Sequence, residues 1–124
     1  LAGAFNPASA TAGQTIFKDI LEKSKQMVSG WGGNMYFIYL PDFSQYSKGI
    51  ENTKSEFVLD TVNELEIPII DIYREVFAYH ADPLSLFPFR MGGLHYNSDG
   101  YRLVGVSIYN RLKADGIIPL NSRN

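Results

Sequence analysis

Two short apolar runs joined by a helical pattern constrain the fold of this chain more than any other feature. Residues 35–40 form a continuous apolar and aromatic run ended by Pro41, and a second run rich in isoleucine covers residues 67–72. Continuous runs of this length are typical of strands covered on both faces, as in a parallel sheet. Between them, an apolar face that includes Phe57 and Val62 predicts a helix. Strand, helix and strand in this order predict a βαβ unit with a right-handed crossover.

Capping signals predict a further helix on each side of this unit. Thr11 and Gln14 have the spacing of a capping box, and the apolar face that follows predicts a helix over about residues 13–29. Asn97 can accept hydrogen bonds from the free amides of a first helical turn. An apolar stripe at helical spacing follows it and predicts a final helix over about residues 98–114.

Two strands leave both edges of a parallel sheet with unpaired amides and carbonyls, so something is expected to cover these edges. The sequence predicts an α/β protein with a partial doubly wound, flavodoxin-like parallel sheet and flanking helices, lacking its N-terminal strands. Residues 1–13, mostly small or polar, are expected to be a linker or a cut end. Residues 14–124 are expected to form one α/β domain, the C-terminal part of a larger one. Either the rest of a longer chain or a second copy would then cover the open edges.

The segment between the second strand and the final helix shows weaker signals. Residues 73–79 are predicted to form a short helix. Residues 84–89 are predicted to form an irregular apolar segment, because Pro88 interrupts them.

Composition excludes several classes of function. The formal net charge is -2, and the Lys and Arg residues are dispersed, so no surface for nucleic acid or acidic lipid is expected. The absence of cysteine excludes disulfides, a thiolate nucleophile and Cys-ligated metal sites. No apolar run approaches the roughly 20 residues that cross a bilayer. The cell compartment stays open.

His95 is the residue best placed for chemistry. It stands just before the predicted helix start at Asn97, where an imidazole is exposed enough to meet a substrate and exchange protons near neutral pH. A surface or capping role is the plainer alternative for such a histidine. In open α/β sheets, ligands collect outside the carboxyl ends of the strands. The residues expected to face that crevice are Asp42, Ser44, Tyr46, Asp71, Arg90 and His95.

The order of these segments carries a resemblance to a known family. The strand at residues 35–41, the strand and helix entry at residues 67–73 and the segment 82–87 follow one another, and then come Gly93-Leu94-His95-Tyr96-Asn97 and Gly100-Tyr101. This order resembles the C-terminal half of SGNH/GDSL-type hydrolases. The histidine segment is the most specific part of the resemblance.

The resemblance implies that His95 is the general base of a serine esterase or O-acyltransferase. It would take a proton from a serine hydroxyl as that serine attacks an ester carbonyl, and then donate it to the leaving alcohol. The family's Gly-Asp-Ser motif is not recognisable here, so the serine is expected upstream of Leu1 and this chain alone is expected to be inactive. The candidate substrate-binding residues are Tyr46 and Arg90, for a small-molecule or carbohydrate ester. No cofactor is expected.

The sequence departs from this family beside the histidine. Gly92 and Gly93 occupy the positions of the aspartate that usually orients the imidazole. A backbone carbonyl, Asp71 or Asp99 is left as the orienting group, although Asp71 is expected to cap the turn after its strand and Asp99 to suit the helix dipole. A pseudoenzyme, or a non-catalytic α/β module that associates through its open sheet edge, is therefore the alternative.

A metal site is the weaker possibility, and none is expected because the potential ligands lack a tight spacing motif. These potential ligands are His80, Asp82, His95 and Asp99.

Overall fold

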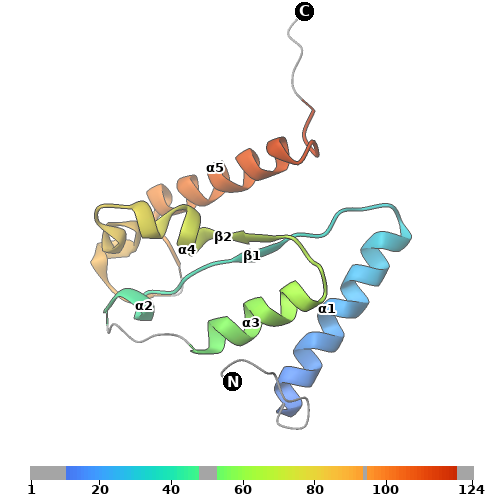
Figure 1. Cartoon of the computed structure of the whole chain (residues 1–124). Helices are drawn as coiled ribbons and strands as arrows, with labels where there is room; N and C mark the ends of the chain where they lie inside the picture. Colours follow the sequence, from blue (N-terminus) through green and yellow to red (C-terminus); the bar gives the residue numbers. More distant parts are fainter. Residues whose placement is uncertain (1–10, 48–52, 94, 120–124) are drawn as a thin grey trace, which may run out of the picture.

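The computed structural model describes residues 11–47, 53–93 and 95–119. In these residues, helices flank a two-stranded parallel sheet (Figure 1). Strand β1 (Phe37–Tyr39) pairs with β2 (Ile69–Asp71), with Phe37 opposite Ile69 and Tyr39 opposite Asp71. Helix α3 (Thr53–Glu64) lies between the two strands in the chain, which confirms the predicted strand, helix and strand order.

Different helices cover the two faces of this sheet. Helices α1 (Ala12–Gly30) and α3 lie on one face, and α5 (Ser98–Ala114) lies on the other (Figure 1). Side chains alternate along the strands as the pleat requires. Ile70 packs on the α5 side and its neighbour Ile69 packs on the α1 side.

Each face therefore has its own apolar cluster. The α1-side cluster has three buried residues, which are Leu21, Val62 and Ile67. The α5-side cluster has seven buried residues, which are Ile70, Ile72, Phe77, Leu86, Phe87, Tyr96 and Val104. The larger of the two clusters thus lies beneath the segment that carries His95.

The capping signals correctly located two helix starts. Thr11 Oγ1 accepts a hydrogen bond from the Gln14 amide at 3.2 Å, and Gln14 Oε1 accepts one from the Thr11 amide at 2.9 Å. Asn97 Oδ1 accepts from the Gly100 amide at 3.0 Å, and α5 covers the predicted range. Helix α1 begins at Ala12, one residue before the predicted start, and residues 1–10 of the expected linker lie outside the described part of the chain.

The strands are shorter than the apolar runs that predicted them. Each has three residues in the ladder, and the residues of β1 are half-buried where full cover on both faces was predicted. Ladder length depends on the partner strand, and in the described part of the chain β1 has a partner on one edge only.

Short helical turns replace the predicted helix over 73–79 and the irregular segment over 84–89. A proline at the first position of two of these turns supplies a helical φ without needing an amide partner. The turns are α4 (Ile72–Glu75) and the 3-10 helices η2 (Phe77–Tyr79), η3 (Pro83–Leu86) and η4 (Pro88–Arg90), and α2 (Ser44–Ser47) follows β1. The four turns between β2 and α5 bring the chain back to the carboxyl end of β1.

Candidate functional site

A pocket of about 190 Å³ lies at the carboxyl end of β1. Its walls come from the residues after β1, from the residue between η3 and η4, from the segment before α5 and from α5 itself. They are Leu40, Pro41, Asp42, Phe87, Gly93, His95, Tyr96 and Tyr101. The loop that carries His95 therefore returns to the strand edge where ligands were expected to collect.

Tyr96 fixes this loop to the end of the strand. Its hydroxyl donates a short hydrogen bond to the carbonyl oxygen of Pro41 in a buried setting. Its ring packs against Phe77 and Phe87, with centroid distances of 5.3 Å to each. Burial raises the pKa of the Tyr96 hydroxyl above its usual range, so this group stays a neutral donor.

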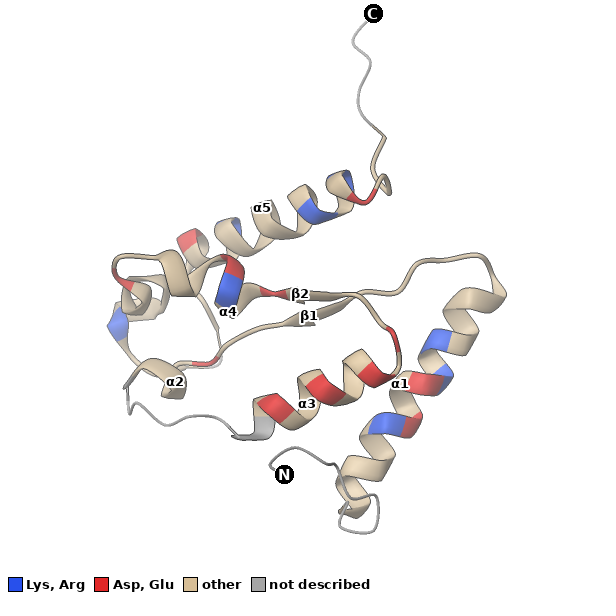
Figure 2. Ribbon diagram, in the orientation of Figure 1, with Lys and Arg blue, Asp and Glu red and all other residues tan. Residues whose placement is uncertain are grey.

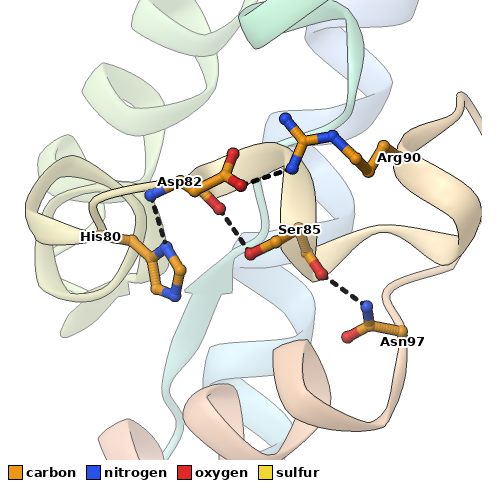
Figure 3. A network of polar contacts seen from close by, with 5 residues as sticks. All are labelled: His80, Asp82, Ser85, Arg90 and Asn97. Carbon is orange, nitrogen blue, oxygen red and sulfur yellow. Dashed lines mark hydrogen bonds and ion pairs between the residues drawn. The ribbon is translucent and has the colours of Figure 1, made fainter.

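Asn97 provides a second anchor one residue further on. Its backbone amide donates to the Leu86 carbonyl at 2.9 Å, and its side-chain amide donates to the Ser85 carbonyl at 2.7 Å (Figure 3). Together with its capping bond, these contacts tie the start of α5 to η3. The backbone of His95 is thus held on its C-terminal side by two successive anchored residues.

The imidazole of His95 is exposed at the pocket and makes no hydrogen bond to any described residue. Its ring is therefore free to turn toward a bound molecule. An exposed imidazole beside a largely apolar pocket can accept and donate protons near neutral pH. The pocket has no serine or threonine among its described lining residues.

Asp42 stands in the same pocket and is held by its own loop. Its Oδ1 accepts hydrogen bonds from the amide of Ser44 at 2.8 Å and from the hydroxyl of Ser44 at 2.5 Å. Its backbone amide donates to Gln45 Oε1 at 3.1 Å. Ser44 thus supports the Asp42 carboxylate and is not itself among the lining residues.

The two predicted substrate-binding residues lie elsewhere. Tyr46 stacks on Phe77 at 5.3 Å and on Tyr73 at 6.1 Å, and burial raises its pKa above the usual range. Its hydroxyl is buried and has no hydrogen-bond partner among the described residues. Arg90 is paired with Asp82, as Figure 3 shows. Neither Tyr46 nor Arg90 lines the pocket that contains His95.

The two carboxylates that sequence reasoning left open as partners of His95 are also placed elsewhere. Asp71 accepts a hydrogen bond from the Arg74 amide at 3.2 Å and lies 3.5 Å from its Nε atom, which confirms its predicted capping role. Asp99 lies in the first turn of α5. Neither belongs to the pocket lining.

The remaining chemical groups form no second site of this kind. No three potential metal ligands come together within the described ranges, and His80 Nδ1 accepts a hydrogen bond from the Asp82 amide at 3.0 Å (Figure 3).

The charged residues in the described part of the chain form no single patch on the ribbon. Acidic residues lie along α3, and basic residues are spread over α1 and α5 (Figure 2). Across all the described residues, no helix combines the length and apolar character needed to span a bilayer.

Comparisons with protein-family models, with curated proteins and with solved structures found no match. The sequence predicted that His95 and Asp42 lie at the same edge of the sheet. It did not predict that Tyr101 lines the pocket or that Tyr96 anchors the loop of His95 to Pro41. The spacing of Tyr101 after Asn97, one turn into a capped helix beside the histidine, is the signal that could have found this wall.

Proposed function

We propose that the pocket containing His95 is the proton-transfer half of a serine esterase or O-acyltransferase site of the SGNH type. The observation that supports this most is an exposed imidazole at a pocket beside the carboxyl end of β1, on a loop anchored by Tyr96 and Asn97. This is the position at which open α/β sheets bind ligands. An imidazole buried in apolar packing, away from any cavity, would have argued against the proposal.

In this proposal, His95 takes the proton of a serine hydroxyl while the serine oxygen bonds to the acyl carbon of an ester. It then returns the proton to the departing alkoxide, and a second cycle with water or another alcohol releases the acyl group. The apolar walls formed by Leu40 and Phe87 suit a small acyl group. The serine comes from polypeptide outside this sequence.

The proposed arrangement of that polypeptide follows from the open edge of β1. Further strands that pair there in parallel would complete a doubly wound, flavodoxin-like sheet and bring their carboxyl ends beside the pocket. Leu40, which follows β1, is about half exposed and lines the pocket, so such a strand would also cover apolar surface.

The test is made on a longer chain encoded by the same reading frame, including the residues upstream of Leu1. We expect turnover of a short-chain ester, and we expect His95→Ala to lower kcat by about 10³-fold or more. His80→Ala is the matched control, because His80 is the other histidine of the chain and lies outside the pocket. Unchanged turnover in His95→Ala, or an equal loss in His80→Ala, would refute the assignment.

A second candidate function is a non-catalytic module that associates through an apolar surface. Helix α1 supports it, because Ile16, Ile20 and Met27 remain exposed on the helix, and Trp31, just after it, is 72% exposed. Contiguous exposed apolar side chains of this size commonly mark contact surfaces. A stable dimer in solution, together with a reading frame that contains no upstream serine motif, would favour this candidate over the esterase.

A further inference from the structure

We infer that Asp42 is the carboxylate that orients the imidazole of His95, in place of the aspartate that Gly92 and Gly93 do not supply. Asp42 acts here as a positioning residue. The purpose of this pairing rests on the proposed esterase function, but the pairing itself is measurable without any ester.

Both side chains belong to one small pocket. Asp42 and His95 line the same space of about 190 Å³, and the other titratable side chains among its walls are Tyr96 and Tyr101. Burial keeps Tyr96 neutral by raising its pKa, and its hydroxyl is already bonded to Pro41. Asp42 is thus the one carboxylate among the described lining residues.

A buried hydrogen bond holds together the two segments that carry these side chains. Tyr96 directly follows His95, and Pro41 directly precedes Asp42. The bond from the Tyr96 hydroxyl to the Pro41 carbonyl therefore joins the immediate neighbours of the two residues.

The carboxylate of Asp42 is fixed at one of its two oxygens. Oδ1 is held by the amide and the hydroxyl of Ser44. The other oxygen, Oδ2, has no hydrogen-bond partner among the described residues, and neither has the ring of His95. A fixed carboxylate with one free oxygen, in the same pocket as a free imidazole, is suited to select one ring nitrogen as the N–H donor and leave the other as the base.

The competing acidic groups are less suited. Asp71 is paired with Arg74, whose positive charge offsets its own. Asp99 lies on α5 near the exposed Arg102 and outside the pocket walls. Neither places a carboxylate oxygen among the groups that face His95.

The expected consequence of this pairing is a fixed tautomer of the His95 imidazole. A carboxylate oxygen that accepts from one ring nitrogen holds the proton there, so removing the carboxylate charge lets the proton redistribute between the two nitrogens.

The experiment is a long-range 1H–15N NMR spectrum of the 124-residue chain in alkaline buffer, which shows for each of its two histidines which ring nitrogen carries the proton. Asp42→Asn keeps the oxygen that accepts from Ser44 and removes the charge. We expect one tautomer to dominate at His95 in the unmodified chain and both tautomers to be populated in Asp42→Asn. His80 is the control in the same spectrum, because its Nδ1 accepts from the backbone amide of Asp82 and its tautomer should not change.

Three results would overturn the inference. They are an unchanged tautomer population of His95 in Asp42→Asn, an equal change at both histidines in Asp42→Asn, and a larger change at His95 in Asp99→Asn. In the longer, active chain we expect Asp42→Asn to lower kcat about tenfold or more with little change in KM.

The outcomes separate this inference from the proposed function. A tautomer change at His95 in Asp42→Asn without any ester turnover in the longer chain would refute the esterase and leave the pairing in place. Ester turnover that needs His95 but is indifferent to Asp42→Asn would refute the pairing and leave the esterase in place.

Discussion

The hydroxyl of Tyr96 joins two segments that lie 55 residues apart in the sequence. Because the bond is buried, removing the donor leaves the Pro41 carbonyl without its partner in a place that water reaches poorly. We expect Tyr96→Phe to lower the free energy of unfolding by about 1–2 kcal/mol, measured by urea denaturation. Tyr101→Phe is the control, since this ring is half exposed and its hydroxyl makes no hydrogen bond to described residues. Equal effects of the two variants would contradict this prediction.

Sequence reasoning succeeded for residues whose roles depend on their immediate neighbours. Asn97 caps α5 and Asp71 caps α4 through amides three residues away, which spacing in the sequence can indicate. The position of Tyr46 could not be predicted, because its ring stacks on Tyr73 and Phe77, which are distant in the sequence. The ion pair of Arg90 with Asp82 could not be predicted either, because it forms only when the turns η3 and η4 fold one after the other.

Among the elements, α5 must approach its neighbours closely at its first turn. A Cβ atom built at Gly100 would lie 2.8 Å from the Leu86 carbonyl oxygen and 2.8 Å from the Cβ of Tyr96. We expect Gly100→Ala to cost about 2–3 kcal/mol of stability, because backbone and a buried ring would have to shift. Gly105→Ala, on the same helix, meets nothing within 4 Å and is expected to gain about 0.5–1 kcal/mol. The two midpoints in urea should move in opposite directions, and a shared direction would refute the packing argument.

The far end of α5 is held to the sheet by a polar network. Asp115 accepts from the Tyr36 hydroxyl at 2.8 Å and from Arg111 Nε at 2.9 Å, and Arg111 also donates to the Ile69 carbonyl at 3.1 Å. The hydrogen bonds from Tyr36 and Arg111 hold the pKa of the Asp115 carboxyl below its usual value.

This network predicts a pH dependence of stability. A carboxyl whose pKa is lowered by folding stabilises the folded state above its unfolded pKa, near 3.8 for Asp, and loses that contribution as the pH falls through the folded value. We expect Asp115→Asn to reduce the difference in unfolding free energy between pH 7 and pH 3. Urea titrations at the two pH values measure it. An unchanged difference would show that Asp115 has the same pKa in both states.

For the elements as a group, helices were predicted better than strands. Capping boxes and caps are local, so the starts of α1 and α5 were correct within one or two residues. A strand exists only as far as its partner pairs, and the apolar runs around β1 and β2 extend beyond the three paired residues of each. The 3-10 turns between β2 and α5 depend on prolines and on packing against Tyr96, which periodicity does not describe.

For the whole molecule, the uneven division of the core is the property that the sequence did not reveal. The isoleucines of the run around β2 look alike in the sequence, yet their alternating side chains pack into a cluster of seven buried residues on one face and a cluster of three on the other. The site lies over the larger cluster. Helix α1, whose Ile16, Ile20 and Met27 are exposed, covers the smaller cluster and contributes the buried Leu21 to it.

This division predicts that the molecule opens first on the side of α1. Fewer buried apolar contacts mean a lower free energy of local opening, so amides of α1 should exchange with deuterium through a sub-global opening while those of α5 need nearly global unfolding. Native-state hydrogen exchange followed by mass spectrometry measures both. Leu21→Ala should lower the protection of α1 by about 2 kcal/mol or more and leave that of α5 nearly unchanged, whereas Ile20→Ala, at an exposed neighbour, should alter neither appreciably. If Leu21→Ala lowers the protection of both helices equally, the two clusters form one cooperative unit, and the pocket would then lose its rigidity together with α1.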